Sequence, residues 1–201
     1  MADVKTIIAD EKTPDGKWLA SRTTEAGRVF TRAWVYFNNM RNRCNPAGAQ
    51  QRIRENYQGC INAFGTFQSF ADWALQQPGY GIDGWCLDKD LLVKGNKTYS
   101  ALTCVFVPTA INNALTNRRL HRGPLPIGVA IDSRTGKTFR AYIASNGKDI
   151  RIGAFPTIEE AFTAYKERKE ESLRALAEKF KEQIDPRAYH ALMHYQIEIT
   201  D

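Results

Sequence analysis

Residues 127–170, IGVAIDSRTGKTFRAYIASNGKDIRIGAFPTIEEAFTAYKERKE, decide the fold of the second half of the chain. Apolar residues alternate with polar or small ones in three segments, near residues 127–132, 139–144 and 150–153. This period of two is typical of β-strands. The turns DSRTGK and SNGK carry glycine where a hairpin needs a positive φ. The stretch therefore predicts a three-stranded antiparallel sheet with one apolar face.

A long helix is expected to follow the sheet and cover that apolar face. Thr157 and Glu160 have the spacing of a capping box at its start. Apolar residues then recur every three or four positions, namely Ile158, Phe162, Tyr165, Leu173, Leu176 and Phe180. Pro186 ends this run, and we expect a short helix and a strand-like tail beyond it.

The other face of the predicted sheet is suited to DNA. Alternation along the strands sends Arg140 and Tyr142 to solvent, and Arg151 on the next strand with them. Gly128 and Ala130 would leave the first strand nearly bare on that side. A flat face with small residues and projecting arginines can enter the major groove, where arginine pairs bidentately with guanine.

The excess positive charge of the chain lies in the same region. The whole chain has a net charge of +6, and residues 117–151 alone hold eight basic and two acidic residues. Further candidates for DNA contacts are the linker arginines and the basic residues at the turns: Arg118, Arg119, Arg122, Arg134, Lys137 and Lys148. The alternative interpretation is a basic face that is merely solvated. The concentration of positive charge on predicted strands favours nucleic acid as the partner.

A second stretch, WCLDKDLLVKGNKTYSALTCVFVPTAINNAL at residues 85–115, predicts a strand, a loop, a strand and a helix. Helices are also expected over residues 31–44 and 64–80, from their apolar spacing and the breakers Pro46 and Pro78. We therefore predict an α+β fold. Residues 1–116 are expected to form an N-terminal helical region with a ββα-metal-like hairpin-helix, and residues 117–126 a basic linker. Residues 127–201 are expected to form a three-stranded antiparallel sheet packed on one long helix, followed by C-terminal helices.

The hairpin-helix has candidates for a metal site. A ββα-metal site needs an acidic ligand at the end of its first strand, a base beside that ligand and a further ligand on the helix. Asp88 ends the first strand, and Asn112 lies early in the helix. Asp90 and Asn96 are further oxygen donors in the loop. Such oxygen ligands suit Mg²⁺ or Mn²⁺.

Two family resemblances cover residues 30–201. Residues 127–170 resemble the ethylene-response-factor (AP-two) DNA-binding domain as it occurs in phage endonucleases, through the GV strand, the Gly-Lys turn and GAFPTIEEAFTAY. LDKDLLVKGNKTYS and CVFVPTAIN resemble the HNH (ββα-metal) motif of phage homing-type endonucleases. This resemblance implies that Asp88 and Asn112 hold the metal and that Thr103 takes the place of the motif's middle asparagine. It also implies a protein that is encoded by a phage or mobile element and acts in the bacterial cytoplasm.

The residue after Asp88 departs from the standard motif. Standard HNH sites have a histidine general base there, whereas this chain has Lys89, an amine that is ordinarily protonated at pH 7. We therefore assign Asp88, Lys89 and Asn112 as candidate catalytic residues, with Lys89 contacting phosphate. The alternative is a catalytically silent derivative that acts as a DNA-binding transcriptional repressor, expected as a homodimer on a palindromic operator. An RNA-binding or structural protein is a third class, but no single-strand stacking motif supports it.

The remaining features bound the class of protein. No run of apolar residues is long enough to span a membrane, and the charged start MADVKTIIADEK is unlike a signal peptide. We therefore expect a cytoplasmic protein with no membrane partner. The four cysteines lack any C-x-x-C pair, which favours free thiols over zinc ligands. His190 and His194 have a metal-binding spacing without a third ligand, and we expect surface histidines.

Overall fold

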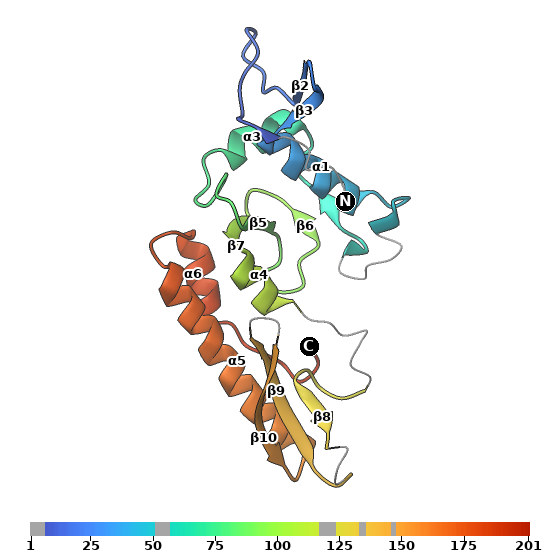
Figure 1. The fold of residues 1–201 in the computed structure, drawn as a ribbon, viewed down its shortest axis with the longest axis vertical. Helices are drawn as coiled ribbons and strands as arrows, with labels where there is room; N and C mark the ends of the chain where they lie inside the picture. Colours follow the sequence, from blue (N-terminus) through green and yellow to red (C-terminus); the bar gives the residue numbers. More distant parts are fainter. Residues whose placement is uncertain (1–6, 51–56, 117–123, 133–135, 146–147) are drawn as a thin grey trace. The chain divides into compact units, whose positions relative to one another are not determined.

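The computed structural model describes residues 7–50, 57–116, 124–132, 136–145 and 148–201. Within them the chain is a mixed α+β protein with five helices and small sheets, as predicted for the fold class (Figure 1). Its contacts divide it into two compact units, Met1–Pro108 with Gln183–Asp185, and Thr109–Glu182 with Pro186–Asp201. The predicted linker at 117–126 falls mostly outside the described residues, so the predicted domain division stays a prediction.

The first unit begins with a small sheet and two helices. The strands β1 (Ile7–Ile8), β3 (Gly27–Thr31) and β2 (Ser21–Thr24) form a sheet in that order, with β2 and β3 as a hairpin. The helix α1 (Arg32–Cys44) follows at once, and the hydroxyl of Thr31 caps it by accepting the N–H of Trp34. The helix α3 (Phe67–Ala74) is capped in the same way by Thr66. Both predicted helices are confirmed.

Aromatic side chains form the core between these elements. Phe37 and Phe70 are buried with their ring centroids 5.8 Å apart, and Phe106 from a later strand is fully buried beside them. Offset and edge-to-face rings of this kind stabilise a core beyond their area alone. The aromatics of α1 and α3 are therefore core residues rather than stacking surfaces for bases.

The stretch at residues 85–108 folds as the predicted strand, loop and strand. β5 (Trp85–Asp88) pairs antiparallel with β7 (Val105–Pro108), and Asp88 lies opposite Val105 at the end of the ladder. β6 (Thr98–Tyr99) lies in the segment between β5 and β7 and pairs parallel with β4 (Ile61–Asn62). All four residues of β7 are buried, so this strand anchors the loop to the core of the first unit.

The second unit contains the predicted three-stranded antiparallel sheet. Its order is β10 (Lys148–Phe155), β9 (Phe139–Ser145), β8 (Val129–Ile131), with the central strand β9 paired on both sides. The helix α5 (Ile158–Phe180) contacts all three strands and runs alongside them (Figure 1). The hydroxyl of Thr157 caps α5 by accepting the N–H of Glu160 at 3.1 Å. Ala141 and Ile143 are buried under α5, as expected.

Two details of the sheet differ from the expected alternation. Gly128 precedes β8 with φ +75°, and a Cβ on it would lie 2.1 Å from the Tyr165 ring of α5. Gly128 therefore lets the strand approach the helix, and does not serve to leave the opposite face bare. The pairing of β10 with β9 also shifts between Arg151 and Gly153, so Ile152 is an extra residue in the strand. Gly153, instead of Ile152, lies opposite Ala141.

Two further helices complete the second unit. α4 (Thr109–Leu115) follows β7 directly in the chain and groups with this unit through contacts with α5, whereas the predicted first domain extends to residue 116. α6 (Pro186–Met193) is the predicted short C-terminal helix. The expected strand-like tail does not form in residues 194–201, where the N–H of Ile197 instead donates to Glu170 of α5 at 3.0 Å. In the part of the chain described, none of the helices has both the length and the apolar character to cross a membrane.

Candidate functional site

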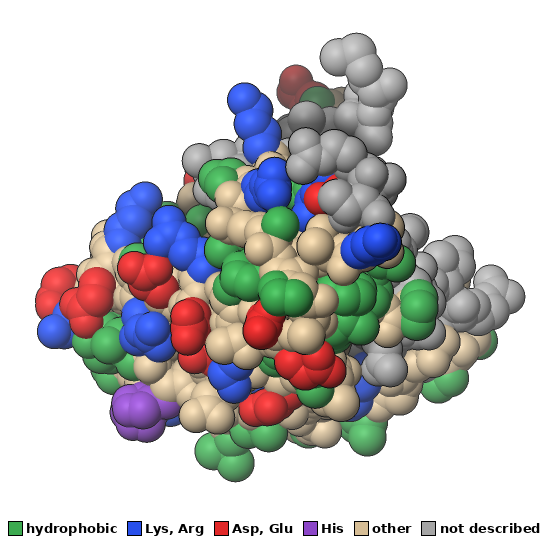
Figure 2. Space-filling view, turned by 90° about the horizontal axis from the view of Figure 1, so that it is seen from below, with side chains coloured by type: hydrophobic (Ala, Val, Ile, Leu, Met, Phe, Trp, Pro, Cys, Tyr) green, Lys and Arg blue, Asp and Glu red, His purple; other side chains and the backbone are tan. Residues whose placement is uncertain are grey.

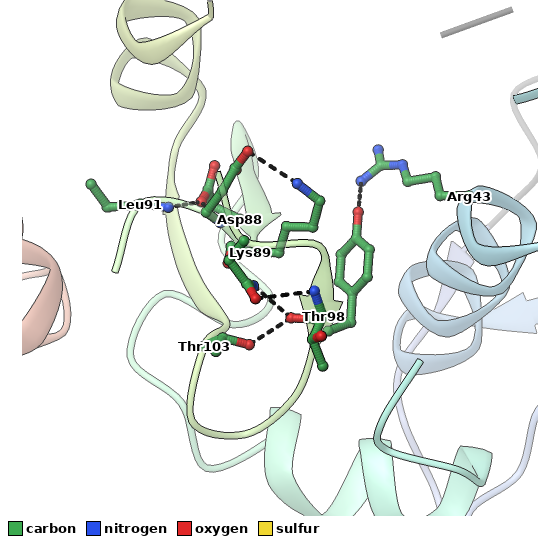
Figure 3. Close-up of polar contacts among 9 residues, drawn as sticks. Arg43, Asp88, Lys89, Leu91, Thr98 and Thr103 are labelled. Atoms are coloured by element: carbon green, nitrogen blue, oxygen red, sulfur yellow. Dashed lines mark hydrogen bonds and ion pairs between the residues drawn. The ribbon is translucent and has the colours of Figure 1, made fainter. Parts of the chain in front are cut away.

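Asp88 is a buried carboxylate at the end of β5. Its side chain is held by backbone, because Oδ1 accepts the N–H groups of Asp90 at 2.9 Å and of Leu91 at 2.7 Å (Figure 3). Burial, and then the nearby charge of Asp90, raise the pKa of Asp88 to about 6, although these two hydrogen bonds act in the opposite direction. Asp88 therefore fixes the start of the loop, and its carboxyl group stays largely protonated below about pH 6.

Lys89 follows Asp88, at the position where the HNH resemblance predicts a histidine. Its side chain is only 6% exposed, and its Nζ lies 3.0 Å from Oδ2 of Asp90. Nζ also lies 6.0 Å from the centroid of the Tyr99 ring. A protonated amine has only hydrogens to donate, so in this arrangement Lys89 neutralises carboxylates and offers no lone pair to a water molecule. The buried position also gives Lys89 little access to a phosphate.

The remainder of the loop is held by side-chain hydrogen bonds. The amide nitrogen of Asn96 donates to the carbonyls of Lys89 and Thr98, both at 2.7 Å, and its oxygen accepts the N–H of Thr98 at 3.1 Å. The hydroxyl of Thr103 donates to the same carbonyl of Thr98 at 2.7 Å (Figure 3). Asn96 is therefore a loop-shaping residue whose oxygen is already engaged, which differs from its expected role as a spare metal donor.

Tyr99 and Arg43 lie behind the site, and neither is among the candidate residues predicted from the sequence, although Tyr99 falls within the motif LDKDLLVKGNKTYS. Tyr99 is 1% exposed, and burial raises the pKa of its hydroxyl. Arg43, from the last turn of α1, donates to that hydroxyl at 3.4 Å (Figure 3). Its guanidinium also lies over the ring of Tyr57. The one sequence signal for Arg43 is its position off the apolar stripe of α1, which is common to most surface arginines.

The groups around Asp88 are better suited to an internal ion pair than to binding a divalent ion. One oxygen of Asp88 already accepts two backbone N–H groups, and the ammonium of Lys89 holds the neighbouring carboxylate. A second cation beside a buried ammonium would be repelled. Across the described ranges, no group of three or more His, Cys, Asp or Glu side chains is placed to hold a metal. Asp88 belongs to the first unit and Asn112, half-buried in α4, to the second, so their pairing as Mg²⁺ or Mn²⁺ ligands stays a prediction.

The open face of the sheet brings together the predicted DNA-binding residues of β9 and β10. Arg140 does not project freely: its Nη2 contacts the carboxylate of Asp132, and its Nη1 donates to the hydroxyl of Tyr142 at 3.3 Å. These contacts keep the Arg140 side chain 22% exposed. Arg151 is exposed and lies opposite Tyr142 in the register, so the two share a face. Arg140, Tyr142 and Arg151 are thus neighbours on one surface.

Other predicted contacts are exposed or lie outside the described residues. Lys137 and Lys148 are exposed at the ends of β9 and β10. The positions of Arg118, Arg119, Arg122 and Arg134 fall in segments that are not described. Figure 2 shows basic and acidic side chains interspersed over the visible surface. On β9 and β10, the basic residues are Arg140 and Arg151 of the open face and Lys148 at the start of β10.

The histidines form a separate pair, whereas Cys104 lies close enough to Asp88 and Lys89 to interact with them electrostatically. His190 and His194 are exposed and stacked with centroids 4.3 Å apart, and histidine side chains are visible at the surface in Figure 2. The four cysteines form no disulfide bond within the described residues. Burial raises the pKa of Cys44 to about 11 and that of Cys104 to about 12, so both are poor nucleophiles.

No protein-family model, no curated protein and no solved structure matches the chain. The resemblances to the HNH and AP-two families therefore rest on their sequence motifs.

Proposed function

We propose that the chain is a sequence-specific, double-stranded-DNA-binding protein of the phage HNH homing-endonuclease type, which inserts the open face of β8, β9 and β10 into the major groove. One observation carries this proposal: the face opposite α5 presents Arg140, Tyr142 and Arg151 together, with small side chains around them. Arginine on a flat surface is the commonest means of recognising guanine edges. The resemblance to the AP-two domain implies the same mode of binding.

The surrounding charge supports the proposal. The exposed Lys137 lies just before β9 and the exposed Lys148 begins β10, so both stand at strand ends, where they would contact phosphates. Residues 117–151 carry an excess of six positive charges, which would release counterions from DNA on binding. Binding of this kind weakens steeply as the salt concentration rises.

Two arginine substitutions and a matched control test the proposal. Selection from a pool of duplexes with a randomised segment would first give a bound sequence for the full chain. Arg140→Ala and Arg151→Ala are each expected to weaken binding to that duplex by about 1–3 kcal/mol and to relax its base preference. Arg174→Ala, an exposed arginine on α5, removes the same charge away from the open face and should have little effect. Unchanged binding in both open-face variants would rule out the sheet as the DNA-binding surface.

A second candidate function is DNA binding without cleavage, and the Lys89 ion pair favours it. Cleavage by an HNH site needs a group that accepts a proton from water, and Lys89 is buried and paired with Asp90 instead. The arrangement suits the catalytically silent alternative, a DNA-binding transcriptional repressor acting in the bacterial cytoplasm, as a homodimer on a palindromic operator.

Incubation of the selected duplex with Mg²⁺ or Mn²⁺ separates the two functions. A repressor would retain the duplex intact while binding it tightly. Metal-dependent cleavage that disappears in Asp88→Ala would instead identify an active endonuclease and exclude the silent alternative.

A further inference from the structure

The arginine at the centre of the open face is held by a buried carboxylate. Asp132 is 1% exposed, and its side chain contacts Nη2 of Arg140. The backbone of Asp132 is itself fixed, because its N–H donates to the carbonyl of Thr138 at 2.8 Å and its carbonyl accepts the N–H of Gly136 at 2.7 Å. Asp132 is thus too buried to reach a ligand and too well fixed to follow Arg140 if that side chain moves.

The strands on both sides of Arg140 leave room around its side chain. The register places Ala130 of β8 and Ala154 of β10 opposite Arg140, one on each side. Both alanines are exposed, so the row across the sheet is a single long side chain between two short ones. In this row nothing longer than a methyl group stands between the guanidinium and a base pair laid against the face.

The contacts of Arg140 leave part of its guanidinium for a ligand. One hydrogen of Nη2 is directed at Asp132 and one of Nη1 at Tyr142. Each of these nitrogens carries a second hydrogen, and together the two form the fork that arginine uses for O6 and N7 of guanine. A carboxylate and a hydroxyl that hold the guanidinium from one side lower the cost of immobilising this flexible side chain on binding.

We propose that Asp132 is the positioning residue for Arg140, and that the pair makes Arg140 specific for one guanine in the major groove of double-stranded DNA. This inference rests on the proposed function. Tyr142 assists by accepting from Nη1, and Arg151, which has no such carboxylate partner among the described residues, is left with greater freedom. The contribution of Asp132 is therefore to base discrimination at a single position.

The test compares base-preference profiles of the full chain, obtained by selection from a pool of duplexes with a randomised segment. Wild-type protein is expected to enrich a motif containing a guanine whose preference is lost in Arg140→Ala. Asp132→Asn, which removes the charge but keeps the shape, should reduce the preference at that same position by about 10-fold and leave the other positions unchanged. Glu167→Gln removes an equal charge from the exposed side of α5, away from the open face, and should keep the whole profile.

Each contrary outcome has a distinct meaning. If Arg140→Ala loses the guanine preference but Asp132→Asn retains it, Asp132 is only structural and the inference is overturned. If both variants retain the preference, Arg140 does not recognise a base, and the inference is overturned again. If the wild-type chain enriches no motif, the proposed function itself fails. Should Asp132→Asn not fold, Tyr142→Phe removes the other contact of Arg140 and must weaken the preference at the same position, or the inference is wrong.

Discussion

The ammonium of Lys89 lies 3.0 Å from the carboxylate of Asp90, and the Lys89 side chain is almost completely buried. Asp88 lies within electrostatic reach of both groups, since Asp90 raises its pKa and Lys89 lowers it. Lys89, at the position where the HNH resemblance predicts a base, therefore supplies a fixed positive charge. This charge substitutes for part of the neutralisation that a metal ion would give to two neighbouring carboxylates.

Replacement of Lys89 by methionine should raise the pKa of Asp88 further. The substitution keeps a similar volume and removes the positive charge that now favours the ionised carboxylate. A pH titration of the Asp88 carboxyl carbon by NMR would measure the change. Lys94→Met, on an exposed residue of the same loop, serves as the control and should leave this pKa where it is.

Ionisation of Asp88 should make the protein less stable as pH rises from about 4 to about 6. The pKa of Asp88 is about 6 in the folded chain, against about 3.9 for an unfolded aspartate, so the folded state binds the additional proton in this window. At pH 7 the buried charge then costs about 2–3 kcal/mol.

Asp88→Asn should remove this pH dependence and be more stable than the wild-type chain at pH 7, by about the same amount. Denaturant unfolding of both proteins at pH 4.5 and pH 7.5 (about three pH units apart, in buffer free of divalent ions) measures the difference. Parallel stability curves for the two proteins would contradict the prediction.

Gly128→Ala should destabilise the second unit by about 2–4 kcal/mol. The new methyl group would lie 2.1 Å from the Tyr165 ring, at a φ that L residues rarely adopt. Gly136→Ala is the matched control, because Gly136 also has a positive φ but nothing lies within 4 Å of its added Cβ. Its cost should be only about 1 kcal/mol, and equal losses in thermal unfolding would show that strain of φ alone is responsible.

Loss of the Asn96 side chain should loosen the loop between β5 and β6. Asn96→Ala removes three hydrogen bonds, at a cost of about 2 kcal/mol. The carbonyl of Lys89 loses its Asn96 donor, while that of Thr98 keeps the hydroxyl of Thr103. Hydrogen exchange in residues 89–98 should accelerate. Leu102→Ala, at a residue that is 81% exposed in the next connection, should change neither the exchange nor the stability by a comparable amount.

Lys148→Ala should weaken DNA binding almost equally for every sequence. An exposed lysine at the edge of the sheet would contact phosphate, so its loss should reduce the salt slope of binding by about one unit. Titrations of the selected duplex and of an unrelated duplex at several salt concentrations measure this. A change in base preference would mean that Lys148 contacts bases instead.

The sequence predicts the sheet and its covering helix well because both depend on periodic burial. Alternation identifies Arg140 and Arg151 as residues of the open face, and the capping residue Thr157 marks the start of α5. The same alternation also puts Asp132 on the face of Arg140, but its place in a turn sequence suggests only a local role. The contact between the two side chains required the strand register.

Other features could not be predicted from the periodicity of the sequence. The burial of Lys89 depends on the packing of Tyr99 and on carboxylates on both sides of it in the chain, and a lysine in a polar loop gives no sign of this. The role of Gly128 depends on a ring contributed from a position 37 residues later in the chain, Tyr165. Both are consequences of tertiary packing.

The extra residue Ile152 reverses the alternation of side chains between the two faces of β10. Before it Arg151 lies opposite Tyr142, and after it Ala154 lies opposite Arg140, so two residues an odd number of positions apart face the same way. If the strand instead alternated strictly through Ile152, Gly153 and Phe155 would turn to the open face and Ala154 toward the helix. This single extra residue therefore determines which chemical groups the surface displays.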